Sequence, residues 1–138
     1  MLRAVVDVNV LVSAALSPEG SPAVVVDAWR AGRFELVASP ALLAELEDVT
    51  ARARLSTRLG DAGQALAGLL SATALVQDDP PAERSVPGDP SDDYLVALAR
   101  AAGASVIVTG DHHLLDLEGL RPPAIEPGAF LSLIERLP

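Results

Sequence analysis

The chain has no cysteine among its 138 residues, and its only histidines are the adjacent pair His112 and His113. The absence of cysteine excludes disulfide bonds, thiol catalysis and zinc sites built on thiolates. Two neighbouring histidines do not by themselves make a histidine-rich metal centre. Any metal ion that this chain binds must therefore be held by oxygen ligands.

Lysine is absent as well, so all 10 basic residues are arginines. Phosphoryl-receiver domains and haloacid-dehalogenase-type phosphatases also place aspartates at the carboxyl edge of a small parallel sheet, but both pair a lysine with the phosphoryl group. The phosphatase motif also requires a second aspartate where Asn9 stands. A phosphate-binding P-loop needs lysine too, and we find no glycine-rich nucleotide loop. These classes are excluded.

Aromatic residues and long apolar runs are scarce. Trp29, Phe34, Tyr94 and Phe130 make up only 3% of the chain and are scattered, which favours packing over base stacking. The longest apolar stretches reach about a third of a membrane span, and the N-terminus starts with a strand-like run rather than a signal peptide. We therefore expect a cytoplasmic protein.

Acidic residues outnumber basic ones by 19 to 10, which gives a formal net charge of −9. An acidic surface argues against a nucleic-acid partner, because binding to phosphates normally needs positive charge. The objection is not decisive, because divalent ions held by a carboxylate cluster cancel much of its charge and themselves attract phosphate.

Strand patterns alternate with helix patterns along the chain. We expect strands at residues 2–8, 34–38, 74–76, 105–109 and 124–125, and helices at 9–16, 22–31, 40–51, 61–73, 91–102 and 128–137, the first of which is short enough to be a turn. Residues 78–90 are rich in proline and charge and read as an exposed loop. This order predicts one domain over 1–138, a three-layer α/β/α fold with a central parallel sheet of four to five strands.

Four carboxylates lie at the edges of apolar segments: Asp7, Glu45, Asp92 and Asp111. Asp7 and Asp111 each follow a buried strand, so both are expected at the carboxyl edge of the sheet, where open α/β folds bind their ligands. Acids at such places are costly unless a cation holds them. The pattern indicates a divalent-metal site.

Helical geometry separates the acids that face inward from those that face solvent. Asp92 falls on the apolar face that includes Leu95, whereas Asp93 is expected to point to the far side. Glu45 borders the apolar stripe of the helix at 40–51 and can reach inward. Asp92 and Glu45 are therefore the candidates on these two helices.

Each acid also has an ordinary structural interpretation. Asp92 could only complement the helix dipole, and Asp7 could cap the following helix. Glu45 could be a solvated helix residue, and Asp111 could be the N-cap of residues 112–117. The metal-site interpretation depends on convergence, because four separate elements would have to direct acids at one region by accident.

Two further groups of residues remain open. His112 and His113 are either solvated or act as a proton shuttle. The basic run of Arg52, Arg54 and Arg58 is either a solvated helix end or a contact to the phosphates of a nucleic acid.

Together these residues resemble a PIN domain. The resemblance is carried by four segments in order, VVDVNVL (5–11), PALLAEL (40–46), DPSDDYL (89–95) and VIVTGD (106–111). It is greatest to small prokaryotic PIN proteins that are similar to VapC ribonucleases and are regarded as toxins of toxin–antitoxin pairs. These share the contexts around Ser21 and Gly103, and the likeness spans almost the entire chain.

The resemblance makes Asp7, Glu45, Asp92 and Asp111 an acidic quartet, with Asn9 and Thr109 as polar support. The spacing to Gly103 again favours Asp92 over Asp93. Val8 replaces a threonine or serine that is frequent in relatives, and His113 stands where relatives often have a further acid. Neither departure removes a quartet member.

The chemistry that the resemblance implies is metal-assisted hydrolysis of RNA phosphodiester bonds with Mg²⁺ or Mn²⁺. Asp7 would bridge or directly ligate the metal with Asp92 and Asp111 beside it, and Glu45 would act through water or position the nucleophile. An antitoxin protein and a homodimer are the implied partners. The alternative is a PIN-like module that only binds protein or RNA, since fold alone does not establish catalysis.

Overall fold

A computed structural model describes residues 1–52, 61–81 and 93–137. In this part of the chain five strands form one sheet in the order β3-β2-β1-β4-β5, and every pair is parallel. The strands are β1 (Arg3–Val6), β2 (Glu35–Ala38), β3 (Leu75–Val76), β4 (Val106–Val108) and β5 (Ala124–Ile125). The predicted α/β fold with a central parallel sheet of four to five strands is confirmed.

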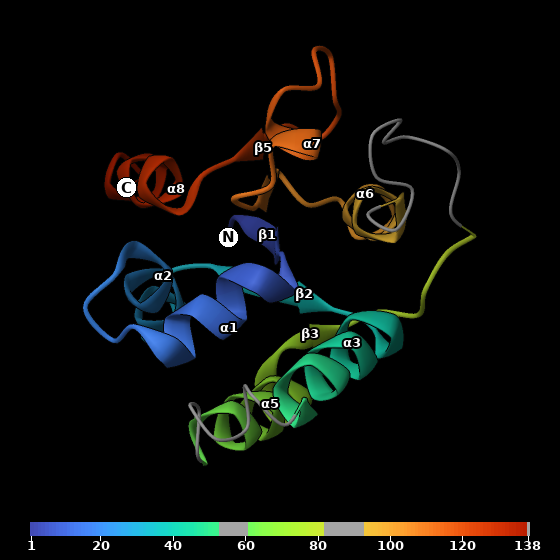
Figure 1. Ribbon diagram of the computed structural model, residues 1–138. Coiled ribbons are helices and arrows are strands. Elements are labelled where there is room, and N and C mark those ends of the chain that lie inside the picture. Colours follow the sequence, from blue (N-terminus) through green and yellow to red (C-terminus); the bar gives the residue numbers. More distant parts are fainter. Residues whose placement is uncertain (53–60, 82–92, 138) are drawn as a thin grey trace.

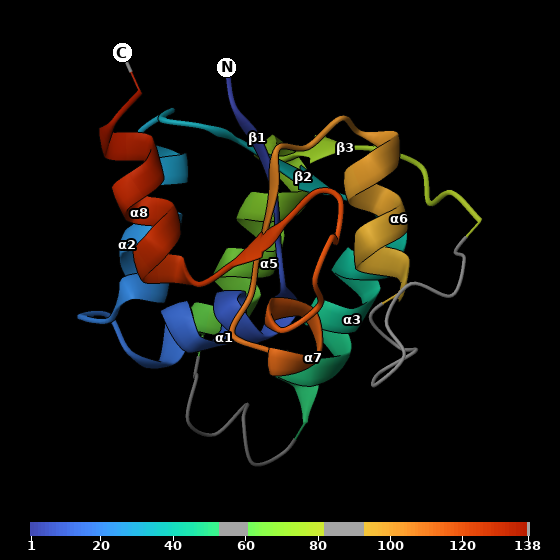
Figure 2. The ribbon, with the colours of Figure 1, turned by 90° about the horizontal axis from the view of Figure 1, so that it is seen from above.

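Helices cover both faces of this sheet (Figure 1). They are α1 (Val8–Leu16), α2 (Ser21–Arg30), α3 (Pro40–Ala51), α5 (Ala62–Thr73), α6 (Asp93–Ala101), α7 (His112–Leu115) and α8 (Pro127–Glu135). α6 packs on β1 and β4 from one face, whereas α1 and α2 lie on the other, and α8 lies beside α2 in both Figure 1 and Figure 2. The result is the three-layer α/β/α arrangement expected from the sequence.

Local signals in the sequence explain where several elements begin and end. The side chain of Ser39 accepts a hydrogen bond from the amide of Leu42 at 3.2 Å, and Pro40 follows at the first helical position, so α3 starts as predicted. Gly32 and Gly103 follow helices with positive φ angles of 77° and 65°, which glycine adopts without strain. Elsewhere the observed bounds agree with the expected ones to within two residues, and the expected start of the helix at 91–102 lies outside the described residues.

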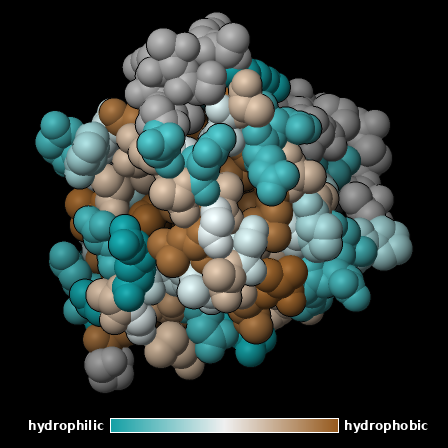
Figure 3. Space-filling view, turned by 90° about the horizontal axis from the view of Figure 1, so that it is seen from below, coloured by the Kyte–Doolittle hydropathy of each residue, from teal (hydrophilic) through white to brown (hydrophobic). Residues whose placement is uncertain are grey.

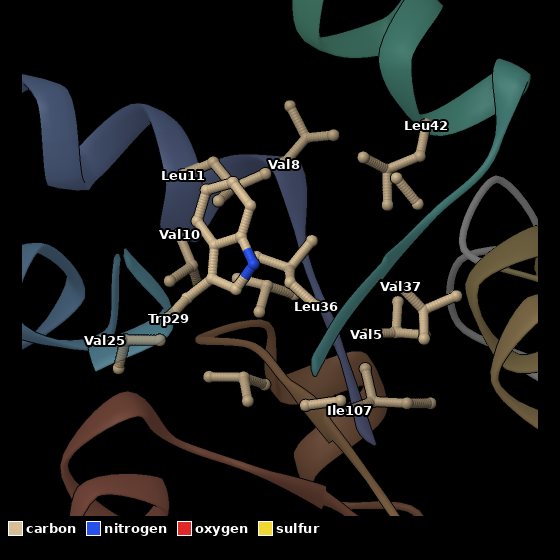
Figure 4. Close-up of a cluster of buried hydrophobic side chains, with 14 of the residues drawn as sticks. Val5, Val8, Val10, Leu11, Val25, Trp29, Leu36, Val37, Leu42 and Ile107 are labelled. Atoms are coloured by element: carbon tan, nitrogen blue, oxygen red, sulfur yellow. The ribbon is translucent and has the colours of Figure 1, made fainter. Parts of the chain in front are cut away.

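The core lies on both sides of β1. In Figure 4 Val5 and Ile107 come from the sheet, while Leu11 and Trp29 approach from α1 and α2. Trp29 is 8% exposed, and Phe34 packs edge to face on Phe130 at 4.8 Å between ring centroids. These three aromatic residues are packing residues, as predicted. The face shown in Figure 3 carries apolar patches bordered by hydrophilic side chains.

No helix within residues 1–52, 61–81 or 93–137 is long and apolar enough to cross a bilayer.

The sheet topology determines where ligands can bind. β1 lies between β2 and β4. From β1 the chain continues to β2 and β3 on one side of β1, and then crosses back to form β4 and β5 on the other side. This reversal creates a crevice at the carboxyl ends of β1 and β4, the usual ligand position in open parallel sheets. Val6 is in register with Val108, so the residues that follow each strand end are neighbours.

Candidate functional site

Asp7 follows β1 directly and is 5% exposed. Its Oδ1 accepts a hydrogen bond from the backbone amide of Asn9 at 3.2 Å, which caps α1. Its Oδ2 accepts a hydrogen bond from Oγ1 of Thr109 at 2.8 Å. Asp7 therefore caps the next helix and also lies at the carboxyl edge of the sheet. The sequence predicted each of these as a separate interpretation. Asn9 supports it through the backbone amide, and the Asn9 residue itself is exposed.

Thr109 links the ends of the two central strands. It follows β4, is fully buried, and donates its hydroxyl hydrogen to Asp7. The same oxygen accepts the backbone amide of Asp111 at 3.0 Å. One hydroxyl therefore fixes the Asp7 carboxylate and the start of the segment that carries Asp111.

Asp111 is the N-cap of the short helix α7. Its Oδ1 accepts the backbone amide of His113 at 2.9 Å, and Nδ1 of His113 lies 3.3 Å from the same oxygen. The Asp111 side chain is 24% exposed, so it lies at the rim of the site rather than below it. The predicted N-cap at Asp111 is confirmed.

Glu45 lies on α3, a different element from those that carry Asp7 and Asp111. Glu45 is exposed, and its Oε2 accepts a hydrogen bond from the hydroxyl of Tyr94, near the start of α6. The scattered aromatic pattern predicts only a packing role for Tyr94 and does not reveal this contact. The available signal was position, because the chain's only tyrosine lies two residues after Asp92.

Electrostatics shows that three of the four acids share one region. Burial raises the pKa of Asp7 above its ordinary value, and the negative charges of Glu45 and Asp111 raise it further. The hydrogen bonds from Thr109 and Asn9 act in the opposite direction, because they stabilise the ionised form. The balance leaves the Asp7 pKa raised, so ionised Asp7 is in an unfavourable place unless a cation is near.

The fourth acid, Asp92, lies outside the described residues, as do Arg54 and Arg58. Arg52 is described, and it is exposed at the C-cap of α3. The expectation that Asp93 points to the far side of its helix was wrong, because Asp93 is 5% exposed. α6 buries a wider face than its sequence pattern predicts. That face includes Val96, one turn after Asp93 and on the same side.

The oxygen donors of these acids are chemically suited to a hard divalent cation. Asp7, Glu45 and Asp111 offer carboxylate oxygens, the ligands that Mg²⁺ and Mn²⁺ prefer. The pKa of Asp7 is raised mainly by burial and further by the charges of Glu45 and Asp111, and a cation near its oxygens would offset both effects. Within the described residues, no three acids or histidines lie close enough to hold an ion by themselves. A complete ligand set would draw on Asp92.

A cleft of about 680 Å³ adjoins Asp111. Asn9 and Asp111 line it on the side of the carboxylates, and Ser13, Ser21 and Gly128 are among its other lining residues. A polymeric ligand that reaches Asp111 therefore has open space beside it.

Comparison with known proteins gives one family. No curated protein matches the chain. The model of the PIN domain family matches residues 3–113, a region that includes Asp7, Glu45, Asp92 and Asp111. Because the match extends over most of the length of the chain, the chain belongs to the PIN domain family.

Proposed function

We propose that this protein is an endoribonuclease that depends on Mg²⁺ or Mn²⁺ and hydrolyses RNA phosphodiester bonds at Asp7, Glu45, Asp92 and Asp111. PIN domains are typically nucleases that use divalent metal ions, so membership of the family supports a nucleic-acid hydrolase. The observation that carries the proposal is the placement of Asp7. It is a buried carboxylate at the carboxyl edge of the sheet, and its pKa is raised by that burial and further by the charges of two other acids.

In this proposal Asp7 is the central ligand because its orientation is fixed before anything binds. Thr109 and the Asn9 amide each engage one of its oxygens, and a carboxylate oxygen that accepts one hydrogen bond still has a lone pair for a cation. Asp92 and Asp111 would complete the ligand set. A bound divalent cation supplies an activated water at neutral pH and neutralises charge on the phosphate under attack.

Glu45 has a different role from the other acids. It is exposed, so its carboxylate can meet a water or an ion at the open side of the site while it accepts the hydrogen bond from Tyr94. Its negative charge contributes to the raised pKa of Asp7, which supports a position within electrostatic range of the buried carboxylate. We assign it to binding through water or to positioning the attacking water.

The cleft beside Asp111 supports a polymeric substrate, because a nucleotide next to the cleaved bond needs space beyond the carboxylates. Arg52, Arg54 and Arg58 are proposed phosphate contacts. The choice of RNA and the role as toxin of a toxin–antitoxin pair come from the family resemblance. In the same proposal residues 1–138 form one domain, the protein is cytoplasmic and forms a homodimer, and an antitoxin protein covers the acidic site.

The test is cleavage of a panel of single-stranded and structured RNAs by the purified protein without partners, beside matched DNA strands, with Mn²⁺ or Mg²⁺. Asp7→Asn and a chelator are the two inactivating controls. Asp48→Asn is the matched control, because it makes the same chemical change at an exposed position of α3. We expect wild type and Asp48→Asn to cut RNA, and both inactivating controls to abolish cutting.

Cleavage of DNA alone would contradict the ribonuclease assignment. Cleavage that survives both Asp7→Asn and chelation would contradict the whole site. A folded protein that stays inert on the panel, and whose Tm does not rise in millimolar Mn²⁺, would favour the binding-module alternative, since a ligand of the folded state must raise its stability.

A further inference from the structure

Tyr94 connects the two helices that flank the acidic site. It is the second residue of α6 (Asp93–Ala101), and its hydroxyl donates a hydrogen bond to Oε2 of Glu45 in the middle of α3. The two residues are 49 positions apart in sequence, so this contact exists only because the fold brings both helices to the same edge of the sheet.

The two partners differ in how firmly they are held. The ring of Tyr94 is partly buried and packs against the hydrophobic core. Glu45 is exposed, and a glutamate side chain loses considerable conformational entropy when it is fixed in one orientation. The packed tyrosine therefore supplies an anchor that the Glu45 side chain lacks.

The chemistry of the donor matters as much as its position. A hydroxyl that donates to a carboxylate makes a charge-assisted hydrogen bond, stronger than one between neutral groups. Unlike an arginine, however, a neutral hydroxyl leaves the negative charge of Glu45 uncompensated. That charge still raises the pKa of Asp7. Tyr94 can thus orient Glu45 and keep it available to a cation or to a water bound to one.

We propose that Tyr94 is a positioning residue of the acidic site, which holds the carboxylate of Glu45 ready for a divalent cation or its water. This inference depends on the proposed function only for the effect on catalysis. The effect on the binding of Mn²⁺ can be measured without a substrate. A purely structural role for Tyr94 would predict a change in stability and no change in the response to Mn²⁺.

The test uses Tyr94→Phe, which removes the hydroxyl and keeps the packed ring, together with Glu45→Gln and the double variant. Glu47→Gln is the matched control, because Glu47 is an exposed acid two positions along α3. Binding of Mn²⁺ is measured by the electron paramagnetic resonance signal of the free ion. RNA cleavage is measured separately as kcat and KM.

We expect Tyr94→Phe to weaken Mn²⁺ binding by about tenfold, the size of one hydrogen bond to a charged group. Glu47→Gln should bind Mn²⁺ as the wild type does. In the double variant, loss of the hydroxyl should add nothing to the effect of Glu45→Gln, because Tyr94 acts through Glu45. In cleavage assays kcat should fall more than KM changes, since the hydroxyl has no assigned contact with RNA.

A direct readout of the contact is available because the chain has a single tyrosine. Glu45→Gln should alter the near-ultraviolet absorption spectrum of Tyr94 in the metal-free protein, and Glu47→Gln should leave it unchanged. An unchanged spectrum in Glu45→Gln would overturn the proposal. So would wild-type affinity for Mn²⁺ in Tyr94→Phe, or additive effects in the double variant.

The outcomes separate this proposal from the proposed function. If Tyr94→Phe weakens Mn²⁺ binding while the wild type cleaves no nucleic acid, the positioning role stands and the ribonuclease assignment fails. If the wild type cleaves RNA and Tyr94→Phe cleaves and binds Mn²⁺ equally well, the ribonuclease stands and the positioning role fails. If the wild type binds no Mn²⁺, both fail.

Discussion

Replacing Thr109 by valine tests the central connection of the site. Thr109 is fully buried, and its hydroxyl makes two hydrogen bonds, to Oδ2 of Asp7 at 2.8 Å and from the amide of Asp111 at 3.0 Å. Valine has nearly the same shape but neither donates nor accepts. The variant therefore removes the donor to a buried carboxylate and leaves the Asp111 amide without its acceptor.

The magnitude follows from these two losses. A hydrogen bond to a charged group contributes about 1.5–3 kcal/mol, and one between neutral groups contributes about 1 kcal/mol. The buried valine methyl recovers part of this sum, so we expect Thr109→Val to lower the free energy of unfolding by about 2–3 kcal/mol at pH 7. For a chain of this size that corresponds to a fall in Tm of roughly 6–12 °C.

The assay is urea unfolding followed by the fluorescence of Trp29, the only tryptophan, which is 8% exposed in the core. Thr109→Ser is the matched control, because serine keeps the hydroxyl and loses only a methyl group, at a cost of about 1 kcal/mol. The loss in the valine variant should shrink as the pH falls, because the bond from Thr109 stabilises the ionised form of Asp7. Equal losses in the valine and serine variants would refute the reasoning, as would an undiminished loss in an Asp7→Asn background.

Three other measurements test neighbouring features. Because the Asp7 pKa is raised, its contribution to stability is full below pH 3.8 and is lost as the pH rises through the folded-state pKa, so metal-free Asp7→Asn should be more stable than wild type at neutral pH by thermal melting. The gain should vanish in acid, and no gain at neutral pH would contradict the sign. Asp92→Asn should abolish RNA cleavage and Asp93→Asn should retain it, because the resemblance makes Asp92 the member of the quartet. Loss of cleavage in Asp93→Asn with full cleavage in Asp92→Asn would contradict this assignment. Ser39→Ala should cost about 1 kcal/mol in urea unfolding, because the Leu42 amide loses its cap; a loss below about 0.3 kcal/mol would contradict the cap.

Much of the fold was predictable because local signals agreed with the global pattern. Ser39 and Pro40 mark the start of α3, and Gly32 and Gly103 follow helices at positive φ. The strand order was not predictable in the same way, since it depends on contacts between segments far apart in sequence. β4 pairs with β1 across about a hundred residues, and only this pairing brings Thr109 to Asp7.

The site was predictable to the extent that backbone geometry determines it. Asp7 and Asp111 follow strands, so their place at the carboxyl edge follows from the parallel sheet. The error at Asp93 arose because a helical wheel gives the directions of side chains but not the width of the face that the fold buries. The contact between Tyr94 and Glu45 depends on how α6 and α3 approach one another, and no periodicity within either helix encodes it.

The arrangement around Asp7 suggests how stability and function are balanced in this chain. A buried carboxylate with acids nearby is unfavourable in the folded state, and the raised pKa of Asp7 reflects that cost. The bonds from Thr109 and the Asn9 amide offset part of it without neutralising the charge, just as the Tyr94 hydroxyl orients Glu45 without neutralising it. An arginine in their place would stabilise the fold but would compete with any cation for the same oxygens. The use of neutral donors at Asp7 and Glu45 therefore fits the proposed site, in which a divalent ion supplies positive charge to these carboxylates.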